Sequence, residues 1–313
     1  MPDHRDITGI LYSWNVRLFR LAVVALGTIL LAGCTATGPD ANTTPSLDFS
    51  TPGTAADMVD TLMAAAGSTR VVNVELTRTE ARVSVVTGVN VTTYAYRDQK
   101  ISPVDSDITY VGQAIFDPRT FNLADLGSLF SQAATVSGSQ QGQQLQIVDY
   151  DNGNIYMNVT TNPETLPVFF TPDGTLVRTV DPTAASDLAT ELTDVLPAAT
   201  TVVRVGIASD LSMYADLPAG QDQIMHVVRA PRFPVRDQLK AESSQPLPFD
   251  SSPVTASAVT TILVNAADHL DRPLSAGFEL TIERRADDTT PTATVTMAGK
   301  TVHLSLAGDI LPS

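Results

Sequence analysis

Residues 144–160 read QLQIVDYDNGNIYMNVT. Apolar and polar residues alternate on both sides of Asp151-Asn152-Gly153-Asn154, and an Asn-Gly pair between two alternating runs favours a β-hairpin. A calcium-binding loop beginning at Asp149 is the alternative. Its sixth position is Asn154 instead of Gly, and its twelfth is Thr160 instead of Glu, so the loop lacks two residues that calcium binding requires. We therefore predict two antiparallel strands here.

Helical patterns alternate with β-patterned runs along the rest of the chain. Apolar residues recur with helical spacing in residues 55–66, 123–135, 184–196 and 253–270. Thr54, Asn122 and Ser252 are the expected N-caps of the first, second and fourth segments. The β-patterned runs that follow the helices are residues 71–76, 81–86, 91–97, 144–150, 154–160, 166–170, 202–207, 224–229, 277–283, 292–297 and 301–306.

Similar short sequences recur in the two halves of the chain. Phe116-Asp117-Pro118 precedes the second helical segment and Phe249-Asp250 the fourth, while residues 170–177 (FTPDGTLV) and 306–311 (LAGDIL) close the halves. An amphipathic helix and a one-sided sheet bury their apolar faces against each other. We therefore predict an α+β fold of two tandem repeats, each with two helices packed on an antiparallel sheet, and few contacts across the joint at 179–183. Chance recurrence of common turn words is the alternative.

The N-terminal segment carries an export signal. Arg17 and Arg20 precede an uncharged apolar run, residues 21–32, which ends in Leu31-Ala32-Gly33-Cys34. The run is too short to cross a hydrocarbon core about 30 Å thick but suits a signal peptide. The segment resembles the lipobox of bacterial lipoproteins. That resemblance implies diacylglyceryl attachment to Cys34, cleavage after Gly33, and a lipid anchor on the extracytoplasmic side of the cell membrane; an uncleaved anchor is the alternative.

These features divide the chain into four predicted parts. Residues 1–33 form the signal peptide, and residues 34–53, rich in Thr, Pro and small polar residues, form a flexible tether. The first α+β domain covers residues 54–181 and the second covers residues 182–313. Burial of the helix and sheet faces against each other predicts helices on one sheet face with the other face free. This order of elements over residues 55–313 is similar to that of PepSY and β-lactamase-inhibitor-type proteins.

Composition and motifs exclude several classes of function. The 313 residues include 19 Lys and Arg against 34 Asp and Glu, a net charge of −15, which disfavours a nucleic-acid partner. A single cysteine excludes an internal disulfide and a multi-thiolate zinc site. We find no H-E-x-x-H, G-x-S-x-G or phosphate-binding loop. We therefore expect no catalytic residue, metal or cofactor; a hydrolase built from distant Ser, His and Asp residues is the alternative.

One basic island stands out in this acidic chain. It consists of His226, Arg229, Arg232, Arg236 and Lys240, which we take as candidates for contact with an anion or a partner. A solvated connector is the alternative. Together these observations predict a non-catalytic, lipid-anchored cell-envelope protein that acts as a protein-binding module, with the membrane and an envelope protein or lipid as partners. A carrier of a lipid or other apolar ligand is the second hypothesis.

Overall fold

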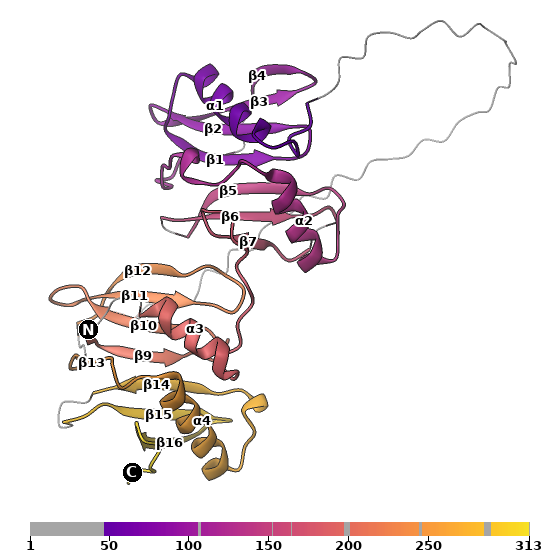
Figure 1. Cartoon of the computed structure of the whole chain (residues 1–313). Helices are drawn as coiled ribbons and strands as arrows, with labels where there is room; N and C mark the ends of the chain where they lie inside the picture. The colour runs from indigo at the N-terminus through magenta and orange to yellow at the C-terminus, as the bar shows by residue number, and fades with distance from the viewer. Residues whose placement is uncertain are drawn as a thin grey trace, which may run out of the picture. The chain divides into compact units, whose positions relative to one another are not determined.

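Two seven-stranded antiparallel sheets contain most of the regular structure (Figure 1). The computed structural model describes residues 47–105, 108–151, 153–163, 165–196, 201–243, 246–284 and 289–312. Pro45–Ser313 group as one unit by their contacts. The predicted signal peptide, Cys34 and most of the predicted tether lie outside the described residues.

The first sheet has the strand order β4-β3-β2-β1-β5-β6-β7. Its elements are α1 (Thr54–Ala66), β1 (Val71–Leu76), β2 (Ala81–Thr87), β3 (Asn90–Arg97), β4 (Lys100–Val104), α2 (Leu126–Ser137), β5 (Gln144–Asp151), β6 (Asn154–Thr160) and β7 (Val168–Phe170). Helix α1 contacts β2 and β3, whereas α2 contacts β6 and β7. Each helix therefore covers its own part of the sheet.

The second sheet has the order β12-β11-β10-β9-β14-β15-β16. Its elements are α3 (Ala185–Val195), β9 (Arg204–Ile207), β10 (Met213–Pro218), β11 (Gln223–Arg229), β12 (Arg236–Ala241), α4 (Ala256–Leu270), β14 (Glu279–Glu283), β15 (Thr292–Met297) and β16 (Lys300–Ser305). A separate two-stranded pair joins β8 (Thr201–Val202) to β13 (Phe249–Asp250). Helix α3 contacts β10, β11 and α4, and α4 contacts β15 and β16.

The two sheets share the same sequence of connections. A four-strand meander, a helix and three further strands build each one. Phe116 bridges to Val71 at the start of β1, and Phe249 pairs with Val202 just before β9. Both phenylalanines are buried, so each brings the chain that leads to the second helix of its half onto the edge of the core.

The closing turns also correspond. After β7, the Gly174 amide donates to the Thr171 carbonyl and the Val177 amide to the Phe169 carbonyl. After β16, the Gly308 amide donates to the Ser305 carbonyl and the Leu311 amide to the His303 carbonyl. The common topology is a finding about structure; descent by duplication and the domain boundaries at 181 and 182 stay predictions.

The expected fold class is wrong. The described residues form a mostly β structure of sixteen strands and four α-helices, with two large antiparallel sheets rather than an α+β fold of helix pairs packed on sheets. The predicted runs lack three strands of the large sheets: β4, β10 and β12. Every residue of the edge strands β4 and β12 is exposed, so these two strands have no buried apolar face. Strand β10 lies inside the second sheet, but the buried Asp216 interrupts its apolar pattern.

Three expected N-caps also differ from the structure. Thr54 is the first residue of α1, whose cap position is Gly53 and has no side-chain cap bond. Helix α2 begins at Leu126, because the Asp125 carboxylate accepts a hydrogen bond from the Ser128 amide. Helix α4 begins at Ala256, where the Thr255 hydroxyl caps the Ala258 amide. Asn122, the expected cap of α2, instead donates to the Asp173 carbonyl. Several polar residues near a helix start compete as caps, and the sequence alone ranked them wrongly.

The hairpin prediction is confirmed. Strands β5 and β6 pair antiparallel from Gln144 with Thr160 to Asp151 with Asn154. None of the helices that the structure describes is long and apolar enough to span a bilayer.

Candidate binding site at the junction of the sheets

A groove of about 650 Å³ lies where residues from both sheets meet. Its walls come from β6, β7 and the turn after it on one side, and from α3, β11 and the loop before β12 on the other. The lining residues share an apolar character with a few polar groups among them: Ile155, Tyr156, Phe170, Leu176, Val177, Pro234 and Val235, with Arg178, Thr190, Asp194 and Arg229. We call this the junction groove.

An aromatic cluster joins the two sides next to the groove. Phe233, in the loop between β11 and β12, packs 4.9 Å from Phe169 and 6.0 Å from Tyr150, measured between ring centroids. Tyr150 stacks on Tyr156 at 5.5 Å. Aromatic pairs at such separations contribute about 0.5–1.5 kcal/mol beyond their buried area. Phe233 is thus an anchor that one half inserts into the other, and several contacts cross the joint where few were expected.

Arg229 holds the loop that carries Phe233 in place. We call this loop, residues 230–235 between β11 and β12, the anchor loop. Its side chain is only 4% exposed. Nε donates to Asp194 Oδ2 of α3 at 3.0 Å, Nη2 to the Arg178 carbonyl at 2.8 Å, and Nη1 to the carbonyls of Ala230 and Phe233. The Val180 amide adds a bond of 2.9 Å to the Pro231 carbonyl. One guanidinium therefore ties α3, the segment before α3 and the anchor loop together.

Near Arg229, helix α3 carries a buried acidic side chain, that of Glu191. It lies on the inner face of α3 with 0% exposure, and neither carboxylate oxygen has a hydrogen-bond partner. Burial raises its pKa to about 7, against the lowering effect of the Arg229 charge. Asp187, Asp181 and Asp194 raise it further by repulsion. Because buried polar groups are nearly always hydrogen-bonded, this carboxyl is an outlier.

The structure separates the predicted basic island. In the register of β11 with β12, His226 lies opposite Gln238, and the partners of Arg236 and Lys240 are Val228 and Ile224. Directly opposed residues share a sheet face, so His226, Arg236 and Lys240 lie on one face and Arg229 on the other. Arg232 is an exposed residue of the anchor loop. Their predicted role in contact with an anion or partner stays a prediction.

His226 belongs to a charged network on the face that it shares with Arg236 and Lys240. Its Nδ1 lies 2.6 Å from Asp216 Oδ1, and Arg204 pairs with Asp216, Glu242 and Glu283 at 2.8, 3.1 and 3.2 Å. Burial lowers the pKa of Arg204, but these carboxylates raise it well above its usual value. His303 Nδ1 lies 3.0 Å from the Thr294 hydroxyl.

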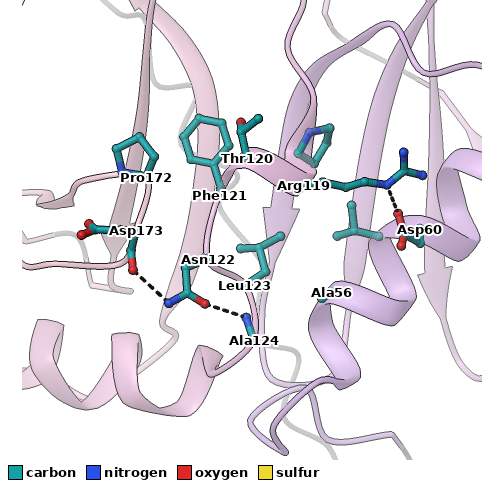
Figure 2. Close-up of a pocket in the computed structure, with 12 residues that line it drawn as sticks. Ala56, Asp60, Arg119, Thr120, Phe121, Asn122, Leu123, Ala124, Pro172 and Asp173 are labelled. Carbon is teal, nitrogen blue, oxygen red and sulfur yellow. Dashed lines mark hydrogen bonds and ion pairs between the residues drawn. The ribbon is translucent and has the colours of Figure 1, made fainter.

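Figure 2 shows a second hollow, in the first half, between α1 and the loop that leads to α2. Its volume is about 410 Å³, and Ala56, Asp60, Phe121 and Leu123 are among its lining residues. Asn122 Nδ2 donates to the Asp173 carbonyl at 2.9 Å, while its Oδ1 accepts from the Ala124 amide at 3.2 Å. Arg119 Nε pairs with Asp60 at 2.9 Å. Its polar groups thus satisfy one another, and the hollow offers no cluster of convergent charge.

Sequence reasoning singled out Arg229 but missed Phe233 and Glu191. Phe233 sits in the stretch Ala230-Pro-Arg-Phe-Pro-Val235, in which two prolines interrupt any strand or helix pattern. Glu191 was detectable, because it falls on the apolar stripe of its helix with Leu188, Leu192 and Val195. Within the described part of the chain, no group of three or more His, Cys, Asp or Glu residues could hold a metal ion.

No family model and no curated protein sequence matches this chain. A structural search returns the DNA polymerase sliding clamp of Pseudomonas aeruginosa, with 11% identity, a TM-score of 0.16, and coverage of 74% of this chain and 55% of the clamp. It also returns the Helicobacter pylori β clamp bound to a DNA ligase peptide, with 9% identity, a TM-score of 0.16, and coverage of 82% and 66%. The matched region thus spans only about half to two thirds of each clamp. Similarity at this level supports no argument about function.

Proposed function

We propose that this chain is a non-catalytic, lipid-anchored protein of the cell envelope that binds another protein at the junction of its two sheets. The observation that carries the proposal is the gathering of exposed apolar side chains there. Val136, Leu166, Val235 and Tyr150 are all exposed large apolar residues, and each lines a groove of the junction or belongs to its aromatic cluster. Contiguous exposed apolar surface is typical of interaction sites.

A second groove at the junction strengthens this proposal. It has a volume of about 410 Å³ and is lined by the end of α2, the loop before β7, Thr179 and Arg232. Val136 is 56% and Leu166 65% exposed on its walls. Arg232, one of the predicted contact residues, would supply a cation beside these apolar groups. Apolar contacts with one charged group at the rim suit a protein partner.

The carrier hypothesis remains the second candidate because of the size of the junction groove. Its volume of about 650 Å³ falls in the range of roughly 300–1,000 Å³ that is typical of ligand pockets, and its walls are largely apolar. Native mass spectrometry of the protein purified from its own membranes separates the two ideas. A co-purifying lipid supports the carrier, and a lipid-free mass favours the protein-binding module.

Crosslinking in intact membranes tests the protein-binding proposal. We expect wild type to capture a reproducible partner and Leu166→Asp to lose it, because a carboxylate in the groove wall opposes apolar contact. Val264→Asp changes an exposed valine of α4 and is the matched control, which should capture as wild type does. Equal capture by all three proteins would refute a partner site at the junction.

Replacement of the lipobox cysteine tests the anchor. Cys34→Ala removes the thiol that would carry the diacylglyceryl group, so we expect incorporation of labelled fatty acid to be abolished. The protein should then appear as unprocessed precursor or in the soluble fraction, because two acyl chains provide the stable attachment. Labelling and membrane fractionation that match wild type would show that the chain is attached in another way.

A further inference from the structure

The inner face of α3 places an unpartnered acid beside the residue that holds the junction together. Glu191 is fully buried and both of its carboxylate oxygens lack a hydrogen-bond partner. Four of the five N–H donors of Arg229 are engaged by the Asp194 carboxylate and by the carbonyls of Arg178, Ala230 and Phe233. An ionised Glu191 therefore meets a cation that is already largely committed to other acceptors.

The other groups around Glu191 make its charge harder to accommodate. Asp187 and Asp194 repel it from α3 itself, and Asp181 repels it from the segment before the helix. Strand β10 and helix α4 contribute apolar residues such as Met213, Ala215 and Ile262 to the same core. Arg229 of β11 is the attracting cation. A buried carboxylate without a hydrogen bond is strongly unfavourable, so only a neutral Glu191 suits the arrangement observed.

We propose that Glu191 is a proton-controlled latch of the junction. Protonated Glu191 leaves Arg229 with Asp194 and the three carbonyls, and the anchor loop stays in place. Glu191 has no hydrogen-bond partner in this arrangement, so its ionised form gains one by drawing the guanidinium towards it or by moving into water. The first event weakens the bonds of Arg229 to the loop carbonyls, and the second displaces α3, which carries Asp194, the ion-pair partner of Arg229. Either event loosens the Phe233 loop and opens the junction groove. This inference concerns the junction itself and holds whichever ligand or partner binds there.

The direction of the pH effect follows from linkage. The pKa of Glu191 is about 7 in the closed arrangement, against 4.5 for an ordinary glutamate. The closed junction therefore holds its proton more tightly than an open one. Its stability falls as pH rises from about 4.5 to about 7 and changes little above that range. Between pH 6 and pH 8 the equilibrium constant for opening should rise about tenfold.

Amide hydrogen exchange of the full chain, corrected for the intrinsic pH dependence of exchange, measures this opening. The Val180 amide reports it directly, because it donates to the Pro231 carbonyl across the junction. We expect its protection factor in wild type to fall about tenfold between pH 6 and pH 8, with little change for amides between β9 and β10. Glu191→Gln should remove the fall, because its side chain cannot ionise.

Two further variants complete the test. Glu279→Gln makes the same substitution at an exposed position of β14 and should behave as wild type. Glu191→Leu removes the carboxyl in a different way and should also show no fall, which covers the case in which the amide side chain is poorly tolerated. The latch is refuted if the Val180 protection factor in wild type does not change, if both Glu191 variants keep the fall, or if the β9 amides lose protection equally.

Discussion

Gly206→Ala is expected to destabilise the second sheet by about 3 kcal/mol or more, a large part of the stability of an ordinary domain. Gly206 lies in the middle of β9, between Tyr214 of β10 and Thr281 of β14. An added Cβ would lie 2.4 Å from the Leu280 carbonyl oxygen and 2.5 Å from the Tyr214 ring. Glycine in a strand interior often marks such a close approach, and a backbone oxygen cannot move away as a flexible side chain can.

Chemical denaturation with circular dichroism measures this loss. Gly127→Ala is the matched comparison, because the added Cβ would come no closer than 3.0 Å to any atom, the Ser50 carbonyl oxygen. Alanine also favours the helix in which Gly127 lies, so we expect a change within about 1 kcal/mol. A double variant with Tyr214→Leu should stay destabilised, since the Leu280 oxygen remains. Equal unfolding midpoints for Gly206→Ala and wild type would show that β9 can shift away from β14.

Arg229→Leu should cost about 3 kcal/mol or more, because several groups lose a charged donor and a hydrogen bond to a charged group contributes about 1.5–3 kcal/mol. The substitution leaves Asp194 without its ion pair, deprives three carbonyls of a donor, and removes the cation that attracts Glu191. We expect the pKa of Glu191 to rise further, because burial and repulsion are then unopposed. Arg229→Lys keeps the charge but not the planar fork of donors, so its loss should be intermediate.

Equilibrium unfolding in urea tests this result, with Arg119→Leu as the control. Arg119 pairs with Asp60 on the surface, where an exposed ion pair contributes about 1 kcal/mol or less. Proteolysis or exchange of residues near 178–180 and 230–235 should also increase in Arg229→Leu. A loss no larger than that of Arg119→Leu would contradict the view of Arg229 as the hub of the junction.

The basic island shows how far residue type alone can predict a site. Five basic residues close together in an acidic chain suggested one surface. Strand pairing instead divides four of them between two faces of the second sheet, because alternate residues of β11 point in opposite directions, and Arg232 lies in the loop between β11 and β12. Arg229 became the best-partnered residue of the junction and His226 part of a network around Asp216. Only the register of β11 and its contacts with α3 could reveal this division.

Local signals in the sequence determined the elements whose residues carry a strong pattern. The Asn-Gly turn and its alternating flanks predicted β5 and β6, and helical spacing located all four helices to within a few residues. Recurring short sequences predicted corresponding positions in the two halves for Phe116 and Phe249 and for the two closing turns. The LAGC segment predicts a lipid anchor without reference to any fold. The hairpin and helix signals depend on neighbours in the chain, which is why a linear pattern could reveal these elements; the lipid anchor stays a prediction.

The tertiary structure decided what distant contacts control. Strands β4 and β12 exist because a neighbouring strand supplies hydrogen bonds, although all their residues are exposed, and they help to make the fold mostly β. The close approach at Gly206, the insertion of Phe233 among aromatic rings of the first half, and the burial of Glu191 beside Arg229 all join residues far apart in sequence. A linear pattern records the apolar or polar character of a residue but not its partner, and partners determine both the junction and its response to pH.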